Sequence, residues 1–248
     1  MRTIEIIFSP TGGTERVARI IGGRWGGEME TIDLSDPQAD FSQCAIAPED
    51  WTLVAMPSFG GRAPMAAMER LKRLRGNGAK CTLVCVYGNR AFEDTLIEMA
   101  DAARESGFQV SAAIAAVAEH SIMPRYASGR PDAADEAQLA QFADQIARRA
   151  TSQPAIPGNR PYKKAGGGGL IPKAGKDCNR CGLCAAGCPV RAIDPRTLAA
   201  DAKACVSCMR CVKRCPRGAR RVNGAMVAVA SLALRKACSA RKENELFL

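Results

Sequence analysis

Two cysteine runs with the same spacing lie in the last third of the chain and constrain the fold more than any other feature. The first is Cys178-x-x-Cys181-x-x-Cys184-x-x-x-Cys188, and Pro189 follows it. The second is Cys205-x-x-Cys208-x-x-Cys211-x-x-x-Cys215, and Pro216 follows it. Chance duplication of such a spacing is negligible, so the two runs form an internal repeat built for one kind of local structure.

Cysteines separated by two other residues indicate metal binding in this chain. Disulfide frameworks belong to small secreted domains, and the sequence shows no secretion signal, so we do not expect disulfides. Soft thiolates suit iron–sulfur clusters. Zinc is the alternative for paired C-x-x-C motifs, but it fits poorly to four cysteines in each run with a terminal proline. The runs therefore predict iron–sulfur chemistry.

The repeat resembles the bacterial ferredoxins, in which the fourth cysteine of each run binds the cluster of the other run. The resemblance implies two [4Fe–4S] clusters. It assigns one cluster to Cys178, Cys181, Cys184 and Cys215, and the other to Cys188, Cys205, Cys208 and Cys211. The remaining cysteines need no function: Cys81 and Cys85 share one face of an expected strand, and Cys44 and Cys238 match no pattern.

Charge divides the 248-residue chain in two. Residues 1–150 hold 16 Lys and Arg against 20 Asp and Glu, a net of −4, and residues 151–248 hold 19 against 5, a net of +14. A basic half raises the possibility of nucleic-acid binding, but no recognition motif is present. We expect the basic residues near the cysteines to raise the cluster potentials and to attract an acidic redox partner protein. Prominent among them are Arg180, Arg191, Arg210, Lys213, Arg214, Arg217, Arg220 and Arg221.

The composition is that of a globular protein, with 47% hydrophobic and 24% charged residues. No apolar run reaches the 18 or more residues that a membrane helix needs. The N-terminal apolar stretch is too short for a signal peptide, so we expect a cytoplasmic protein.

The first 150 residues predict alternating strands and helices. Apolar strands are expected at 3–8, 29–34, 52–56, 81–86 and 109–117, and amphipathic helices at 14–24, 64–75, 91–105 and 132–150. Five strands alternating with helices predict an α/β fold, a doubly wound five-stranded parallel sheet, with ligands bound above the carboxyl ends of its strands.

The loop after the first expected strand, Ser9-Pro-Thr-Gly-Gly-Thr14, has the chemistry of an anion site. Ser9, Thr11 and Thr14 offer hydroxyl donors, and Gly12 and Gly13 let the backbone approach a phosphate at a helix N-terminus. The loop lacks the dinucleotide and Walker fingerprints. The alternative is a plain strand-to-helix turn with Thr14 as the N-cap.

Two further loops leave the same edge, at residues 57–64 and 87–94. They offer Phe59 and Tyr87 as rings, next to Gly60 and Gly88, with Asn89 and Asp94 as polar partners. Taken singly, Phe59 and Tyr87 are better explained as caps on the core, but three such loops at one edge of one sheet favour a binding site. The only histidine, His120, follows the fifth strand between Glu119 and Ser121, and it either borders the same site or is a loop residue without a role.

Residues 1–150 resemble the flavodoxins, because residues 9–14 match their phosphate loop, Ser/Thr-x-Thr-Gly-x-Thr. The resemblance implies that FMN binds between the three loops. Its phosphate would contact Ser9, Thr11, Gly12, Gly13 and Thr14, and its ring would lie among Phe59, Gly60, Tyr87, Gly88, Asn89 and Asp94. The tryptophan that many flavodoxins stack on the flavin is absent.

Residues 1–220 together resemble flavodoxin–ferredoxin fusion proteins. We expect a flavodoxin-like domain at 1–150, a Pro/Gly-rich linker at 151–176, a small α+β ferredoxin-like domain at 177–222 and a helical tail at 223–248. The resemblance implies electron transfer between two [4Fe–4S] clusters and FMN. No acid–base or nucleophile constellation is visible, which favours a carrier over an enzyme. The alternatives are a cluster-fed flavin reductase with a small substrate, and a first half that has lost FMN and only docks partners.

Overall fold

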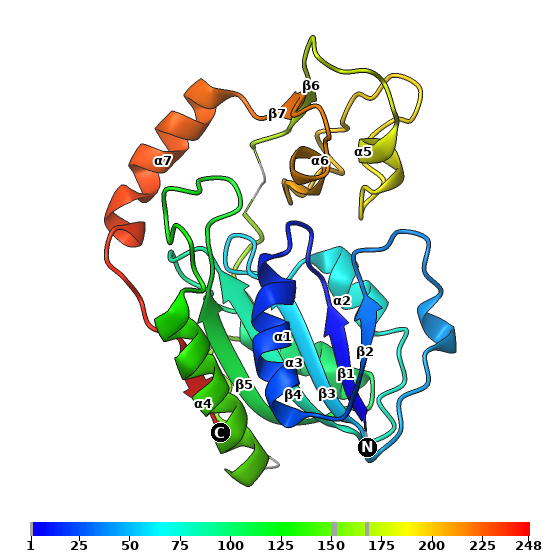
Figure 1. Ribbon diagram of the computed structural model, residues 1–248, viewed down its shortest axis with the longest axis vertical. Helices are drawn as coiled ribbons and strands as arrows, with labels where there is room; N and C mark the ends of the chain where they lie inside the picture. The colour runs from blue at the N-terminus through cyan, green and yellow to red at the C-terminus, as the bar shows by residue number, and fades with distance from the viewer. Residues whose placement is uncertain (1, 150–152, 167–168) are drawn as a thin grey trace.

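The computed structural model describes residues 2–149, 153–166 and 169–248. The predicted domain boundary at residue 150 lies outside these ranges. A six-stranded sheet with the strand order β2-β1-β3-β4-β5-β8 forms the larger part of the molecule (Figure 1). Its strands are β1 (Arg2–Ile7), β2 (Glu28–Asp33), β3 (Trp51–Pro57), β4 (Lys80–Tyr87), β5 (Gln109–Val117) and β8 (Glu245–Phe247). The first five strands are parallel, which confirms the predicted α/β class.

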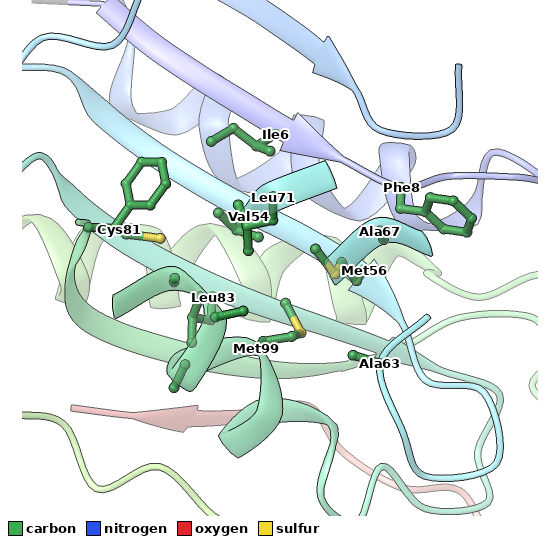
Figure 2. Close-up of a cluster of buried hydrophobic side chains, with 14 of the residues drawn as sticks. Ile6, Phe8, Val54, Met56, Ala63, Ala67, Leu71, Cys81, Leu83 and Met99 are labelled. Carbon is green, nitrogen blue, oxygen red and sulfur yellow. The ribbon is translucent and has the colours of Figure 1, made fainter. Parts of the chain in front are cut away.

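Helices cover both faces of this sheet. On one face lie α1 (Gly13–Trp25) and α4 (Ala133–Arg149), and on the other lie α2 (Met65–Leu71) and α3 (Thr95–Glu105). The short 3-10 helix η1 (Phe41–Gln43) lies in the segment of the chain that connects β2 to β3. The strand β4 shows why both faces are buried: Cys81, Leu83 and Cys85 pack toward α2 and α3, and Val84 and Val86 pack toward α1 and α4. Figure 2 shows the first of these two cores.

Three predicted helices differ from the observed ones at their ends. The helix α1 continues through Gly22 and Gly23 and ends at Gly26, whose φ of 71° only glycine adopts readily. The helix α2 ends at Leu71, four residues before the predicted end. The helix α3 begins at Thr95 rather than at residue 91, because Glu93 has a left-handed backbone (φ 45°) that breaks the helix.

The predicted helical tail at 223–248 is helical only over Gly224–Cys238, and the strand β8 lies in its last part. It runs antiparallel to β5, with Ile114 opposite Leu246, and so adds a sixth strand at the edge of the parallel sheet. Asn244 fixes this strand: its Oδ1 accepts the Val117 N–H (2.8 Å), and its Nδ2 donates to Asp135 Oδ1 (3.1 Å). The end of the chain thus belongs to the larger part of the fold.

The cysteine-containing region lies beyond the carboxyl ends of the parallel strands (Figure 1). It consists of the helices α5 (Leu183–Ala186) and α6 (Arg210–Lys213) and a two-stranded sheet of β6 (Lys173–Ala174) and β7 (Arg220–Arg221). Residues 173–174, which fall in the predicted linker, are therefore paired with this small region.

Backbone carbonyls of each part accept hydrogen bonds from arginines of the other. Arg70 on α2 donates to Pro189 O (2.5 Å), and Arg191 donates to Pro37 O (2.7 Å).

The helix α7 (Gly224–Cys238) leads from the cysteine-containing region back toward β8. Its inner side packs on the loop after β5, where Tyr126 Oη donates to Ser231 O (2.6 Å) and Met123 contacts the same apolar cluster. Among the described residues, no helix is both long and apolar enough to cross a membrane.

Candidate functional site

Hydrogen bonds to two serine hydroxyls and one glycine conformation shape the loop after β1. Ser9 N–H donates to Ser35 Oγ (2.8 Å), and Ser9 Oγ accepts the N–H of Glu15 (2.9 Å), which ties the loop to the first turn of α1. Gly12 precedes the helix with a φ of 93°, a conformation that L side chains rarely adopt. The alternative of Thr14 as N-cap is wrong, because Gly12 is the N-cap and α1 begins at Gly13. Thr11 and Gly13 are half-buried and Thr14 is buried.

Arg210, from the second cysteine run, reaches this loop. Its Nη1 donates to Ser9 O (3.4 Å), and its Nη2 lies 3.6 Å from Asp33 Oδ2 at the end of β2. The side chain is only 6% exposed, and its Nε has no hydrogen-bond partner within the described part of the chain. A residue between Cys208 and Cys211 thus lies against the predicted phosphate loop.

The loop after β3 is a tight turn. Phe59 and Arg62 exchange backbone hydrogen bonds (2.9 and 3.3 Å) around Gly60 and Gly61, both of which have positive φ. Phe59 is half-buried and Gly60 is exposed. The Arg62 guanidinium grips both carboxylate oxygens of Glu98 (2.8 Å each), which holds the turn against α3.

The polar side chains of the loop after β4 form hydrogen bonds with backbone groups of other segments. Asn89 Nδ2 donates to Cys238 O and Ala240 O (2.8 Å each). Asp94 accepts the N–H groups of Asn159 (2.8 Å) and Lys163 (2.7 Å), and these backbone hydrogen bonds keep the pKa of its carboxyl below the usual range.

The ring of the same loop is also engaged in packing. Tyr87 is buried, and its ring packs edge-on against Phe92 at 5.4 Å between centroids. Burial raises the pKa of Tyr87 to about 12. Of the predicted ring contacts, the structure therefore leaves Phe59, Gly60 and Gly88 at least partly accessible.

His120 is a packing residue of the loop that follows β5. Its Nδ1 accepts the backbone N–H groups of Ile122 (3.2 Å) and Met123 (3.3 Å). Burial lowers the pKa of its imidazole. Its ring lies directly over Gly88, where an added Cβ would come within 2.8 Å of it. His120 thereby holds the backbone of the loop after β4.

The four cysteines of the first predicted group surround one pocket. Cys178, Cys181 and Cys184 come from the first run, and Cys215 comes from the end of the second run. Burial raises the pKa of the Cys215 thiol, but hydrogen bonds from the backbone N–H groups of residues 217–220 outweigh it, so the pKa of Cys215 is lowered. Converging N–H groups of this kind stabilise a thiolate.

The four cysteines of the second predicted group are also neighbours. Burial, together with the nearby thiols of Cys188, Cys211 and Cys205, raises the pKa of Cys208 to about 12. The Ala192 N–H points at Cys188 Sγ from 3.3 Å. The folded chain thus brings the fourth cysteine of each run to the first three of the other run.

Both runs have the same unusual backbone. The residues just before and just after the second cysteine have positive φ in each run: Arg180 (58°) and Gly182 (78°), then Ser207 (52°) and Met209 (63°). Three of these four residues are not glycine, and such strain persists only where the surrounding structure requires it. The repeat in sequence is therefore a repeat in structure, wrapped around the cysteines.

Some buried polar atoms of this region have no hydrogen-bond partner among the residues that the structure describes. They are Ser207 Oγ, Arg210 Nε, Arg220 Nε and Arg220 Nη2. Buried polar groups normally find partners, so a polar or anionic group among the cysteines fits this region. Within residues 2–149, 153–166 and 169–248, no group of three or more His, Cys, Asp or Glu side chains could hold a single metal ion.

The strand order β2-β1-β3-β4-β5 with helices on both faces defines a flavodoxin-like α/β protein. Neither the protein-family models nor the curated proteins gave a match. Several solved structures are similar over the larger part of the fold. The Streptococcus pneumonia TIGR4 flavodoxin is 20% identical with a TM-score of 0.42, over 60% of this chain and 99% of that one.

Two other structures give similar values. A flavodoxin from the domain Archaea is 16% identical with a TM-score of 0.44, over 60% of this chain and 97% of that one. A Fusobacterium nucleatum flavodoxin bound to flavin mononucleotide is 13% identical with a TM-score of 0.42, over 61% of this chain and 100% of that one.

Proposed function

We propose that this protein is an electron carrier that passes electrons between two [4Fe–4S] clusters and FMN. The observation that carries the proposal is Arg210, which follows Cys208 in the second run and contacts Ser9 O of the loop after β1. One side chain thereby joins the expected cluster region to the expected flavin phosphate loop. When bound, a cluster supplies one electron at a time and a flavin accepts one or two.

The cysteines support the cluster part of the proposal. Each of the two groups of four contains one cysteine from the other run, as a two-cluster ferredoxin requires. Thiols that are hard to ionise, such as Cys208, release their protons when metal binds. The unpartnered nitrogens of Arg210 and Arg220 are suited to face the negative charge of the clusters.

The loops support the flavin part. We assign the FMN phosphate to Ser9, Thr11, Gly12, Gly13 and Thr14, at the N-terminus of α1, where the helix dipole favours an anion. The flavin ring would lie against Phe59, Gly60 and Gly88. Tyr87, Asn89 and Asp94 would support that site without contacting the flavin, because their side chains are engaged in packing and in hydrogen bonds to the backbone.

The two clusters would have different roles. The second group adjoins the contacts of Pro189, Arg191 and Arg210 with the flavodoxin-like part, so we place it next to the flavin. Cys181 of the first group is exposed, and the neighbouring Leu183 is 53% exposed. Residues 173–221 hold 12 Lys and Arg against 3 Asp and Glu. An acidic redox protein would therefore dock at the first group.

An anaerobic visible spectrum with iron and flavin quantified on the same sample tests the proposal. We expect roughly eight irons and one FMN per chain, with both chromophores bleached by dithionite. Iron without flavin would reject the flavin part and leave a ferredoxin-like region beside a docking domain. Flavin without iron would reject the cluster part.

A matched pair of cysteine variants sharpens the test. Cys184→Ser should lose about half of the iron and destabilise the cysteine-containing region, because metal ligation is coupled to folding. Cys44→Ser, outside both groups, should keep the wild-type iron content. Equal iron in the two variants would contradict the ligand assignment.

A further inference from the structure

Arg220 occupies a position where the internal repeat has an apolar residue. The chain after the first run reads Cys188-Pro-Val-Arg-Ala-Ile193, and after the second run it reads Cys215-Pro-Arg-Gly-Ala-Arg220. The backbone follows the same course in both, with positive φ at Arg191 (50°) and at Gly218 (56°). Ile193 is 6% exposed and Arg220 is 2% exposed. A guanidinium therefore stands in the place of a buried isoleucine.

The surroundings of this guanidinium are thiols and one carbonyl. Arg220 Nη1 donates to Leu198 O (2.8 Å) and lies 3.9 Å from Cys184 Sγ. Arg220 also lies next to the Cys211 thiol. Cys184 belongs to the first group and Cys211 to the second, so the cation lies between the two.

No carboxylate in the described ranges pairs with Arg220, and its Nε and Nη2 have no partner there. A buried cation without a counter-charge is strongly destabilising, because it loses its hydration and gains nothing in return. The anion that fits this place is the one the cysteines would hold. Four thiolates on an oxidised [4Fe–4S] cube leave a net charge of about −2 at each group.

We propose that Arg220 is a positioning residue that serves as the shared counter-charge of the two clusters and raises the reduction potential of both. The inference rests on the proposed function. When a cluster gains one electron its net charge becomes more negative by one, with no bond made or broken and no proton taken up. A fixed cation beside it stabilises the reduced form more than the oxidised form, so reduction becomes easier.

The test compares four forms of the holoprotein. Arg220→Ile introduces the residue found at the equivalent position of the first run. Arg220→Gln keeps hydrogen-bond donors without the charge, and Arg220→Lys keeps the charge without the planar guanidinium group. Arg221→Ile is the control, since Arg221 is the exposed neighbour on the same strand. The readout is a redox titration with dithionite, followed by the electron paramagnetic resonance of the reduced clusters.

We expect both cluster potentials to shift to more negative values in Arg220→Ile and Arg220→Gln, with most of the shift reversed in Arg220→Lys. The shift in Arg221→Ile should be much smaller, because the charge of the exposed Arg221 is screened by solvent. Unchanged potentials in Arg220→Gln, or a shift of one cluster alone, would overturn the proposal. If Arg220→Ile fails to assemble, Arg220→Gln and Arg220→Lys still decide. Wild-type protein without iron would instead refute the proposed function.

Discussion

At the scale of single residues, the molecule contains charged groups that the fold buries in two different ways. Arg220 and Arg210 lie among cysteines that are expected to become anionic. Glu5, on β1, is fully buried, and neither carboxylate oxygen has a hydrogen-bond partner in the described part of the structure. Burial raises the pKa of Glu5 because the ionised form loses its hydration. In the proposed function the first pair would serve a bound group, whereas Glu5 is a cost in stability at neutral pH.

Glu5→Gln should therefore change the pH dependence of stability. A raised pKa in the folded state means that the carboxyl favours folding below its unfolded pKa, and that this benefit is lost as the pH rises through the folded pKa. Relative to wild type, the Gln variant should become more stable as the pH rises from below the usual carboxyl pKa of 4.5 through the raised pKa of the folded state, by about 1.4 kcal/mol for each unit of pKa shift. Urea unfolding across this range measures it, with the exposed Glu28→Gln as control. Parallel profiles for wild type and Glu5→Gln would refute the prediction.

The hydroxyls of the proposed phosphate loop can be tested by substitution. Replacing Thr11 and Thr14 together by Ala should weaken FMN binding by roughly 100-fold or more, since it removes two hydrogen bonds to a charged group, each worth about 1.5–3 kcal/mol. The iron content should stay the same. Flavin fluorescence during titration of deflavinated protein gives the affinity, and Thr31→Ala on β2 is the control. An unaltered affinity would rule out this loop as the phosphate site.

At the scale of elements, the C-terminal segment is the least expected feature. The helix α7 and the strand β8 tie together the cysteine-containing region, the loop after β4 and the edge of the sheet. Asn244 is central to this attachment, because both ends of its buried side chain are hydrogen-bonded to the sheet and to α4. The same segment accepts a hydrogen bond from Asn89, so it also fixes one of the loops of the proposed flavin site.

Asn244→Ala should detach β8 at a cost of about 1–3 kcal/mol, because it leaves the buried Val117 N–H without a partner. Hydrogen exchange should accelerate at the amides of residues 113–115, which pair with β8, and not at those of β1. Ser239→Ala, at an exposed position, is the matched control. Unchanged protection at residues 113–115 would show that the strand pairing does not depend on Asn244.

The helices and strands differ in how well the sequence predicted them. Strong local signals were enough for the five parallel strands and the four helices around them, since continuous apolar runs such as Cys81–Val86 leave few alternatives. The cysteine grouping remains a prediction that rests on spacing. The strand β8 was missed because three residues carry no periodicity and their partner β5 is more than a hundred residues away. The contacts of Arg210 and Arg220 were missed because they depend on how distant segments pack.

At the scale of the whole molecule, the uneven charge has a structural use. Cations of the second half pair with carboxylates of the first half: Arg210 with Asp33, Arg160 with Asp101, Lys163 with Glu93 and Arg241 with Asp132. Each such surface pair contributes little by itself, but together they favour one docking arrangement. The remaining basic residues around Cys181 stay exposed to solvent.

Reversing that exposed charge should change which small oxidants the reduced protein meets. Arg180→Glu combined with Arg217→Glu should slow oxidation by the anion cobalt(III)–EDTA and speed oxidation by the cation hexaamminecobalt(III), each by about 10-fold at low salt. High salt should erase both effects. Stopped-flow bleaching of the clusters measures the rates. Arg148→Glu with Arg149→Glu, at the far end of α4, should leave them unchanged, and equal effects of the two pairs would refute a docking surface at the first group.

The path of the chain from α4 to β8 has a kinetic consequence. The chain leaves the sheet after α4, forms the cysteine-containing region, and is joined to the sheet again by β8. That region is anchored at both of its ends, so its concentration near the loops of the sheet does not fall when the protein is diluted. Exchange of electrons between the two parts would then be first order and independent of protein concentration, whereas exchange with an outside partner would be second order.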